Sequence, residues 1–163
     1  MSNIIAKLKE TSNVRFIVIL ALLAFVVKVP GGILGTIFVS LFDLTDLQYS
    51  AFIQEPTFSG EDMFLAIVFA PFLETLMSQM IPIEMILRTI KGRYLAIIGS
   101  AFVFMLMHYP VLEFFPSAFL VGMVFAWAWV VKRDLGLKKA FIIVTLIHSL
   151  HNALVAASAA LLF

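Results

Sequence analysis

Four polar side chains interrupt long apolar stretches of this chain, and their types could carry out hydrolysis: Glu74, His108, His148 and Asn152. An ionisable group at membrane depth is costly unless it is paired or hydrated, so such residues mark functional sites. A carboxylate and an imidazole can together polarise a water molecule, with Glu74 as general base. A second imidazole and an amide can donate hydrogen bonds to an oxyanion. These roles together describe the hydrolysis of a peptide bond.

The same residue types could instead bind zinc. Glu74, His108 and His148 would supply three protein ligands and leave the fourth position for water. The zinc-binding helix pattern H-E-x-x-H is absent from the chain. Residue types and spacing alone therefore leave a metal-free hydrolase, a zinc hydrolase, a proton relay and a small transporter open as interpretations.

The composition indicates the environment of these residues. Of the 163 residues, 63% are hydrophobic and 13% are charged. Soluble proteins average about 45–50% apolar and about 25% charged residues, so this is an integral membrane protein. Segments such as FLAIVFAPFL are apolar on every face, whereas barrel strands alternate polar and apolar residues. We therefore expect an all-α fold, a polytopic transmembrane helical bundle.

The length is that of one transmembrane domain, residues 1–163, with an N-terminal anchor over about 1–42 and a catalytic-type core over about 62–162. The absence of cysteine excludes disulfides and thiolate chemistry, and the net charge of +1 predicts no nucleic-acid partner. Because a crossing needs roughly 20 apolar residues, the sequence predicts five spans, at about 16–42, 63–88, 94–109, 115–131 and 140–162.

Prolines disturb two of these spans. Pro30, followed by Gly31 and Gly32, interrupts the first, so we expect one broken span or a span followed by a dipping segment. Pro71 and Pro82 lie in the second and are expected to kink that helix and to free backbone carbonyls near the carboxylate that it carries.

The distribution of charge predicts a cytoplasmic N-terminus, because basic residues stay on the cytoplasmic side of short loops. That orientation puts ten basic residues inside: Lys7, Lys9, Arg15, Arg88, Lys91, Arg93, Lys132, Arg133, Lys138 and Lys139. It puts six acidic residues outside: Asp43, Asp46, Glu55, Glu61, Asp62 and Glu113. Among the basic residues, only Lys28 is left out of the cytoplasmic group.

Helix geometry permits the four polar groups to meet. At about 1.5 Å per residue, Glu74 lies about 16 Å below the outer end of its span and His148 lies about 18 Å below the outer end of the last one. Asn152 is one helical turn from His148 on nearly the same face. His108 ends a short helix that would stop below the outer surface, which brings it to a similar depth.

Three short motifs resemble those of the CPBP family of intramembrane proteases, the group that includes the type II CAAX prenyl endopeptidases and bacteriocin-processing enzymes. That family carries E-E-x-x-x-R, then F-x-x-x-H, then H-x-x-x-N on successive core helices. Glu74 begins the first motif, Phe104 and His108 match the second, and His148 and Asn152 match the third. The resemblance covers about residues 62–162.

The resemblance implies an endopeptidase in which Glu74 is the catalytic base, His108 helps to bind the attacking water, and His148 and Asn152 form the oxyanion site. It also implies a peptide or protein substrate that is lipidated or membrane-associated, contact with membrane lipids, and a place in a prokaryotic plasma membrane. His151 could support this site or could be a plain packing contact.

The first motif departs from the family pattern, since Thr75 replaces the second glutamate and Gln79 replaces the arginine. Both side chains can still donate hydrogen bonds that orient Glu74. The departure favours an alternative function, a non-catalytic immunity or scaffold protein with the same fold. A proton-coupled carrier is a further alternative, although five spans without a repeated half disfavour it.

Two further features have structural interpretations. Glu84 and Arg88 lie four residues apart near the inner interface, as expected for an exposed helix pair worth a few tenths of a kcal/mol. Trp127 and Trp129 lie near the cytoplasmic end of their span, as in an interfacial aromatic belt.

Overall fold

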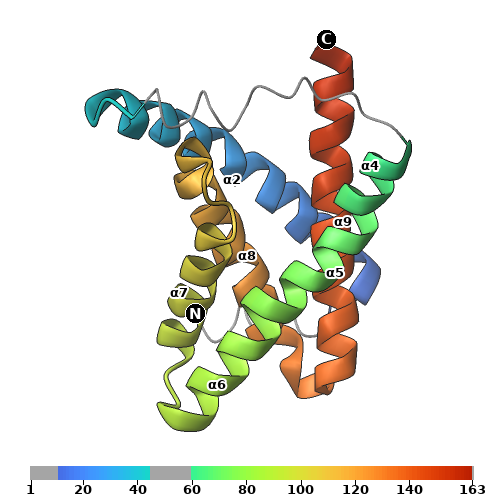
Figure 1. The fold of residues 1–163 in the computed structure, drawn as a ribbon. Helices are drawn as coiled ribbons and strands as arrows, with labels where there is room; N and C mark the ends of the chain where they lie inside the picture. Colours follow the sequence, from blue (N-terminus) through green and yellow to red (C-terminus); the bar gives the residue numbers. More distant parts are fainter. Residues whose placement is uncertain (1–10, 45–59, 163) are drawn as a thin grey trace.

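The apolar stretches fold as helices, which pack into a bundle (Figure 1). The computed structural model describes residues 11–44 and 60–162, so the charges predicted at Lys7, Lys9, Asp46 and Glu55 lie outside the described residues. The described elements, in chain order, are α2 (Asn13–Leu41), α4 (Gly60–Phe64), the π-helical turn η1 (Leu65–Phe69), α5 (Ala70–Glu74), the π-helical turn η2 (Thr75–Met80), α6 (Ile81–Thr89), α7 (Arg93–Leu106), the 3₁₀ turn η3 (Leu112–Phe114), α8 (Phe115–Lys132), the 3₁₀ turn η4 (Arg133–Leu135) and α9 (Leu137–Leu162).

The predicted all-α polytopic bundle is confirmed. Within the described part of the chain, four helices are long and apolar enough to cross a membrane: Asn13–Leu41, Glu61–Thr89, Leu112–Leu135 and Leu137–Leu161. The remaining predicted span, 94–109, corresponds to α7, which has 14 residues. At a rise of about 1.5 Å per residue, α7 is about 21 Å long and too short for a hydrocarbon core of about 30 Å. α7 therefore cannot cross the whole hydrocarbon core by itself.

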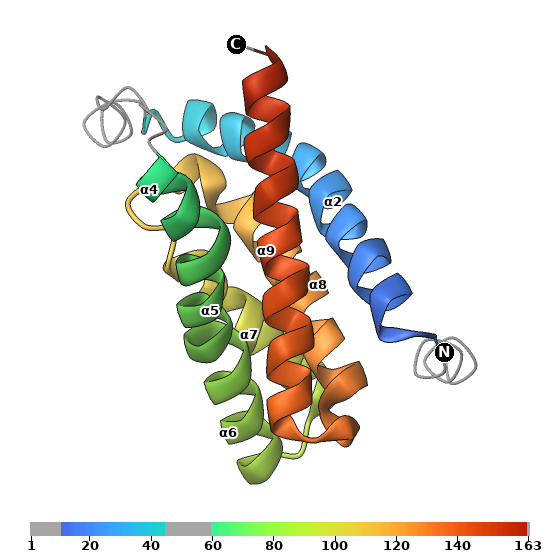
Figure 2. The same cartoon turned by 90° about the vertical axis from the view of Figure 1, so that its right-hand side faces the viewer.

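The predicted break at Pro30 is wrong, because α2 runs without interruption through this residue. Its first turn is capped by Ser12, whose hydroxyl accepts from the Arg15 N–H at 3.5 Å. A proline is tolerated inside a membrane helix when the surrounding helices and local adjustments compensate for the lost hydrogen bond. Figure 2 shows α2 changing direction along its length, as expected for a bent helix rather than a broken one.

The glycines after Pro30 serve helix packing. A Cβ atom on Gly31 would collide with the Cα of Ser117, and one on Gly35 would collide with the carbonyl of Glu113. Thr36 reinforces this contact by donating a hydrogen bond to the Glu113 carboxylate at 2.6 Å. Small residues four apart let helices approach closely in membranes. Gly31 and Gly35 thus allow α2 to pack closely against η3 and the start of α8.

Residues 60–89 form one continuous helix with two π-helical turns, each just ahead of a proline (Figure 1). The residue before each proline donates its N–H five positions back, from Ala70 to Leu65 and from Ile81 to Leu76. The irregularities predicted at Pro71 and Pro82 are therefore π-helical turns, in which the helix is locally wider than an α-helix. Glu74 lies between the two turns, at the end of α5. Such π-helical turns are frequent at functional sites.

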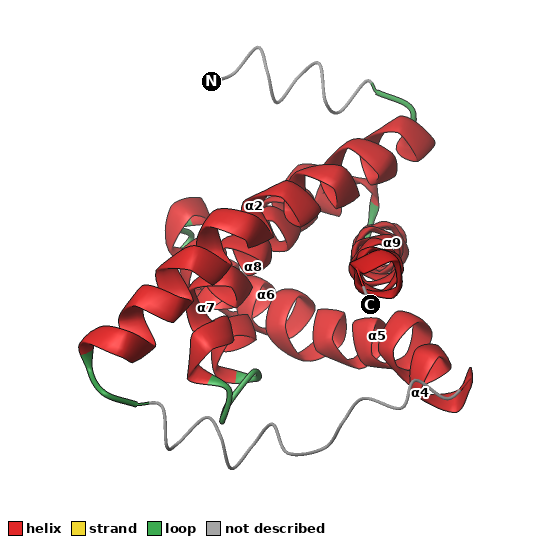
Figure 3. Cartoon of the chain, turned by 90° about the horizontal axis from the view of Figure 1, so that it is seen from above, coloured by secondary structure: helices red, strands yellow, loops and turns green. Residues whose placement is uncertain are grey.

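One end of the bundle gathers the end of α6, the start of α7, the end of α8 and the start of α9 (Figure 1). These helix ends carry Arg88, Lys91, Arg93, Lys132, Arg133, Lys138 and Lys139, the group that the charge pattern places inside. Viewed from above, α9 is seen end-on, with α2 on one side and α4 and α5 on the other (Figure 3).

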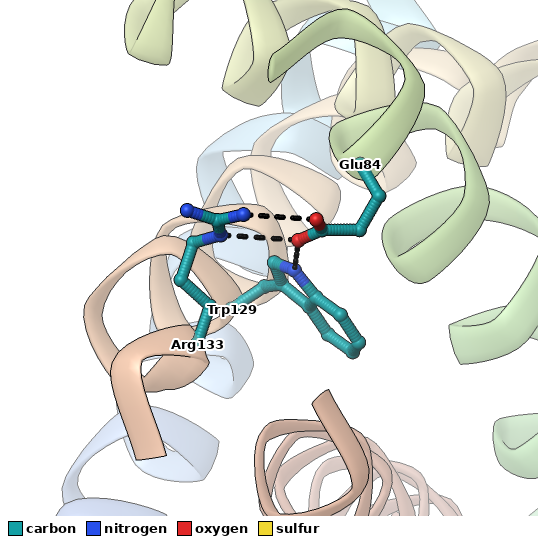
Figure 4. A network of polar contacts seen from close by, with 3 residues as sticks. All are labelled: Glu84, Trp129 and Arg133. Carbon is teal, nitrogen blue, oxygen red and sulfur yellow. Dashed lines mark hydrogen bonds and ion pairs between the residues drawn. The ribbon is translucent and has the colours of Figure 1, made fainter. Parts of the chain in front are cut away.

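A polar network joins α6 to α8 near this basic end (Figure 4). Arg133 donates two hydrogen bonds to the Glu84 carboxylate, at 3.0 and 2.8 Å, and the Trp129 indole donates a third at 3.1 Å. The expectation of an exposed pair of Glu84 with Arg88 is therefore wrong in its exposure and main partner, since Glu84 is buried and bonds to Arg133, while Arg88 adds only a weaker attraction. Trp129 is fully buried rather than interfacial. The carboxylate needs these donors because a buried charge is costly when unpaired.

Candidate active site

All four residues singled out by the sequence line one cavity of about 290 Å³: Glu74, His108, His148 and Asn152. They come from the continuous helix 60–89, the turn after α7, and α9. The cavity also has walls from α2 and α8, because Lys28 and Ser117 line it. The N-terminal helix is thus part of the enclosure of the site.

Glu74 and His148 face each other across this cavity. The Oε2 atom of Glu74 lies 3.5 Å from Nε2 of His148. The His148 side chain is 2% exposed, whereas that of Glu74 is 25% exposed and can reach an incoming water. The His148 ring is held between Phe104 and Phe125, with centroid distances of 5.4 and 4.5 Å. The contact is longer than a good hydrogen bond, as is common in substrate-free sites.

His108 lies in the turn that follows α7. Its Nδ1 is 2.9 Å from the carbonyl of Phe104, and the two rings have a centroid distance of 4.8 Å. A neutral imidazole that donates from Nδ1 has its lone pair on Nε2. Nε2 of His108 is therefore available to accept a hydrogen bond. Phe104, the first residue of the second motif, thus contacts both His108 and His148.

Asn152 connects α9 to the first π-helical turn. Its amide Nδ2 donates to the carbonyl of Ala66 at 2.8 Å. An amide nitrogen carries two hydrogens, so one is left for a ligand in the cavity. The Ala66 bond fixes the direction of that second hydrogen.

Two more titratable side chains line the cavity. His151 is 5% exposed and its ring is 5.8 Å from that of Phe125, which places it at the site as well as in the core. Lys28 lies on the α2 wall. The sequence does contain a signal for Lys28, because it is the one basic residue outside the predicted cytoplasmic group. The sequence alone does not show that Lys28 lines the cavity.

Thr75 and Gln79 lie behind Glu74 and are fully buried. The hydrogen bonds expected from them to Glu74 are not formed, since Thr75 Oγ1 and both amide atoms of Gln79 have no partner among the described residues. Neighbouring hydroxyls do brace this turn: Ser78 donates to the Glu74 carbonyl at 2.6 Å and Ser100 to the Ser78 carbonyl at 2.6 Å. Glu74 is therefore held by its backbone and by His148.

Glu74, His108 and His148 are the side chains that would bind zinc if the site holds a metal. Within residues 11–44 and 60–162, no group of three His, Cys, Asp or Glu side chains is placed to hold a metal ion together. Two of these three donors are in contact, Glu74 with His148 at 3.5 Å, and His108 lines the same cavity.

Comparison with known proteins identifies a family. The family described as Type II CAAX prenyl endopeptidase Rce1-like matches residues 59–154, which is more than half of the chain. The matched region contains all four cavity residues that the sequence singled out, whereas α2 lies outside it. Comparisons with curated proteins and with solved structures gave no match.

Proposed function

This chain belongs to the Rce1-like family of type II CAAX prenyl endopeptidases, and from that premise we propose that it is an intramembrane endopeptidase with Glu74 as general base. The observation that supports the proposal is the contact of Glu74 with His148 at 3.5 Å, in a cavity that His108 and Asn152 also line. A carboxylate close to an imidazole and an amide can activate water and stabilise developing charge.

In this mechanism, a water molecule lies between the Glu74 carboxylate and the free Nε2 of His108. Glu74 removes a proton as the water oxygen attacks the carbonyl carbon of the peptide bond. The resulting oxyanion accepts hydrogen bonds from Nε2–H of His148 and from the second amide hydrogen of Asn152. Glu74 then returns the proton to the amide nitrogen, the C–N bond breaks, and the amine leaves.

The depth of the site indicates the class of substrate. Glu74 is close to the middle of a 29-residue helix, so a peptide bond must enter the membrane region to reach it. A peptide with an apolar or lipid-modified segment could enter at a low desolvation cost, whereas a fully polar peptide could not. We therefore assign a membrane-associated or lipidated peptide as the substrate, in agreement with the prenylated substrates that the family name indicates.

The test is peptide cleavage by the purified protein in nanodiscs, with a library that includes prenylated peptides. Wild type should cleave at least one peptide, and Glu74→Gln should lower kcat by about 10²- to 10⁴-fold, since it removes the general base. His108→Ala should lower kcat in the same direction. Glu61→Gln is the matched control, because Glu61 is an exposed carboxylate near the start of the same helix. It should retain wild-type turnover, and cleavage that survives in Glu74→Gln would contradict the proposed base.

The buried Thr75 and Gln79 favour a second candidate function. At the positions where the family motif has a glutamate and an arginine, this chain has two side chains whose polar atoms have no partner among the described residues. Without that charged pair, the same cavity could bind a peptide and not cleave it. Folded wild-type protein that binds a library peptide without turnover would favour this non-catalytic role.

A further inference from the structure

Lys28 occupies an unusual place for a lysine. It lies in the middle of α2, about 22 Å from the Asn13 end and about 20 Å from the Leu41 end at about 1.5 Å per residue. Lysines near helix ends extend to the membrane surface, but one in the middle cannot readily do so. An intramembrane cation of this kind marks a functional position by default.

The packing of α2 directs Lys28 into the cavity. Lys28, Gly31 and Gly35 are spaced three and four residues apart, so they lie on one face of the helix. The two glycines are in close contact with Ser117 and Glu113, which fixes that face against the start of α8. Lys28 is accordingly one of the cavity-lining residues. Its orientation follows from helix packing, and a simple rotation of α2 would disrupt the glycine contacts.

Lys28 has no ion pair and no hydrogen-bond partner among the described residues, and its side chain is half-buried. A partly buried ammonium without a counter-ion is costly, and an anion bound in the cavity would compensate it. A neutral ligand would leave this cost in place. The site is therefore built to favour a ligand that carries negative charge.

We propose that Lys28 binds a carboxylate of the substrate peptide and so selects which peptides enter the active site. The inference rests on the proposed function for the identity of the ligand as a peptide. Lys28 and Glu74 line the same cavity of about 290 Å³, so an anion at Lys28 and a peptide bond at Glu74 belong to one short segment. Either the C-terminal carboxylate or an acidic side chain close to the cleaved bond could supply the negative charge.

Lys28 is a specificity residue and takes no part in bond cleavage. The mechanism uses Glu74, His108, His148 and Asn152 for every proton transfer and hydrogen bond. Lys28 also lies outside residues 59–154, the region that the family match covers. Its substitution should therefore change KM and peptide selectivity, whereas loss of Glu74 should change kcat.

The experiment compares three versions of a cleaved peptide: one with a free C-terminal carboxylate, one with a C-terminal amide, and the amide with an added glutamate near the cleaved bond. Wild type should prefer one of the two peptides that carry the negative charge. Lys28→Met should raise KM for that peptide by about 10- to 100-fold, as expected for a lost charge-assisted hydrogen bond. KM for the amide peptide without glutamate, and kcat for all three peptides, should stay within about twofold of wild type, far below the change in KM for the preferred peptide. Lys28→Arg should restore the preference, because it restores the positive charge.

Lys139→Met is the matched control, since Lys139 is exposed at the start of α9 and far along that helix from the cavity residues. A free acid and an added glutamate separate the two sources of negative charge. A fall in kcat for all three peptides, with no change in selectivity, would overturn the proposal and indicate that Lys28 acts on Glu74. Equal KM values for the acid and the amide in wild type, with inhibition by phosphatidylglycerol that depends on Lys28, would overturn it in favour of a lipid phosphate.

Binding of the same peptides to Glu74→Gln separates this inference from the proposed function. Wild type and Glu74→Gln should both bind the acid more tightly than the amide, and Lys28→Met should lose this difference. If that result is obtained while wild type cleaves no peptide, the protease is contradicted and the carboxylate site is supported. If binding does not distinguish acid from amide, the Lys28 proposal fails, whatever the turnover shows.

Discussion

Phe104 holds His108 at two points, because its carbonyl oxygen lies 2.9 Å from Nδ1 and its ring lies 4.8 Å from the imidazole. The same ring makes an edge contact with His148 at 5.4 Å. The phenylalanine of the second motif is thus a positioning residue for both candidate catalytic histidines. Its backbone sets the proton position of one imidazole, and its side chain sets the separation of the two.

Phe104→Leu should therefore lower peptidase turnover. The carbonyl that orients His108 is retained, but the aromatic contact between the two histidines is lost. A displacement of a catalytic group by about 1 Å can cost about 10²-fold, so we expect kcat to fall by about 10- to 100-fold with little change in KM. Phe102→Leu is the control, since Phe102 is 50% exposed. Equal loss of turnover in both variants would argue against a positioning role.

The contact of α2 with α8 gives a prediction about stability. Gly31→Ala and Gly35→Ala should each destabilise the protein by about 1–3 kcal/mol, the usual cost of overpacking, because each new Cβ meets backbone atoms. Gly32→Ala provides a control in the same turn, since a Cβ there has nothing within 4 Å. Thermal unfolding in detergent measures the difference. A Tm for Gly35→Ala equal to that of Gly32→Ala would show that α2 does not pack in this way.

The network of Glu84, Trp129 and Arg133 predicts a strong effect of removing one partner. Arg133→Met should destabilise the protein by about 3 kcal/mol, since it leaves the buried Glu84 carboxylate without its cation. The double variant Glu84→Leu with Arg133→Met should recover much of this loss. Arg88→Met, which removes an exposed arginine of the same helix, should change Tm little. Equal losses from Arg88→Met and Arg133→Met would contradict the observed pairing.

The proposed mechanism predicts the response to metal removal. In this mechanism Glu74 activates the water and His148 and Asn152 stabilise the oxyanion, so hydrolysis should proceed without zinc. Treatment with a strong zinc chelator, followed by gel filtration, should leave kcat and KM unchanged. Loss of activity that added zinc restores, together with zinc retained by wild type and not by His148→Ala, would establish the metal alternative instead.

The helical fold and the four cavity residues could be predicted from the sequence because both depend on strong, local signals. Long apolar segments require helices in a membrane, and polar residues within them are too costly to be accidental. The irregular parts could not be predicted in the same way. Pro30 leaves α2 continuous, and the residues just after it, Gly31 and Gly35, pack closely on Ser117 and Glu113, in a segment far away in the sequence.

The partners of charged residues were equally beyond a sequence argument. The spacing of Glu84 and Arg88 fits a helix pair, yet the hydrogen-bonding partner Arg133 is 49 positions away, in η4, and only the tertiary fold brings it close. Lys28 stood out by its position, but its place on the cavity wall depends on how α2 is seated. Tertiary packing decides these pairings, and local spacing gives no information about it.

Gln79 gives a final prediction, since it is fully buried and neither of its amide atoms has a partner in the described part of the chain. Gln79→Leu replaces an unsatisfied amide with an apolar side chain of similar size, a change that is nearly neutral or stabilising. We expect an equal or higher Tm and unchanged kcat, because Gln79 makes no hydrogen bond to Glu74. Ser100→Ala is the contrast, as it removes a buried hydrogen bond to the Ser78 carbonyl and should cost about 1 kcal/mol. A large fall in Tm or kcat for Gln79→Leu would mean that the amide binds a partner, such as a water molecule that supports Glu74.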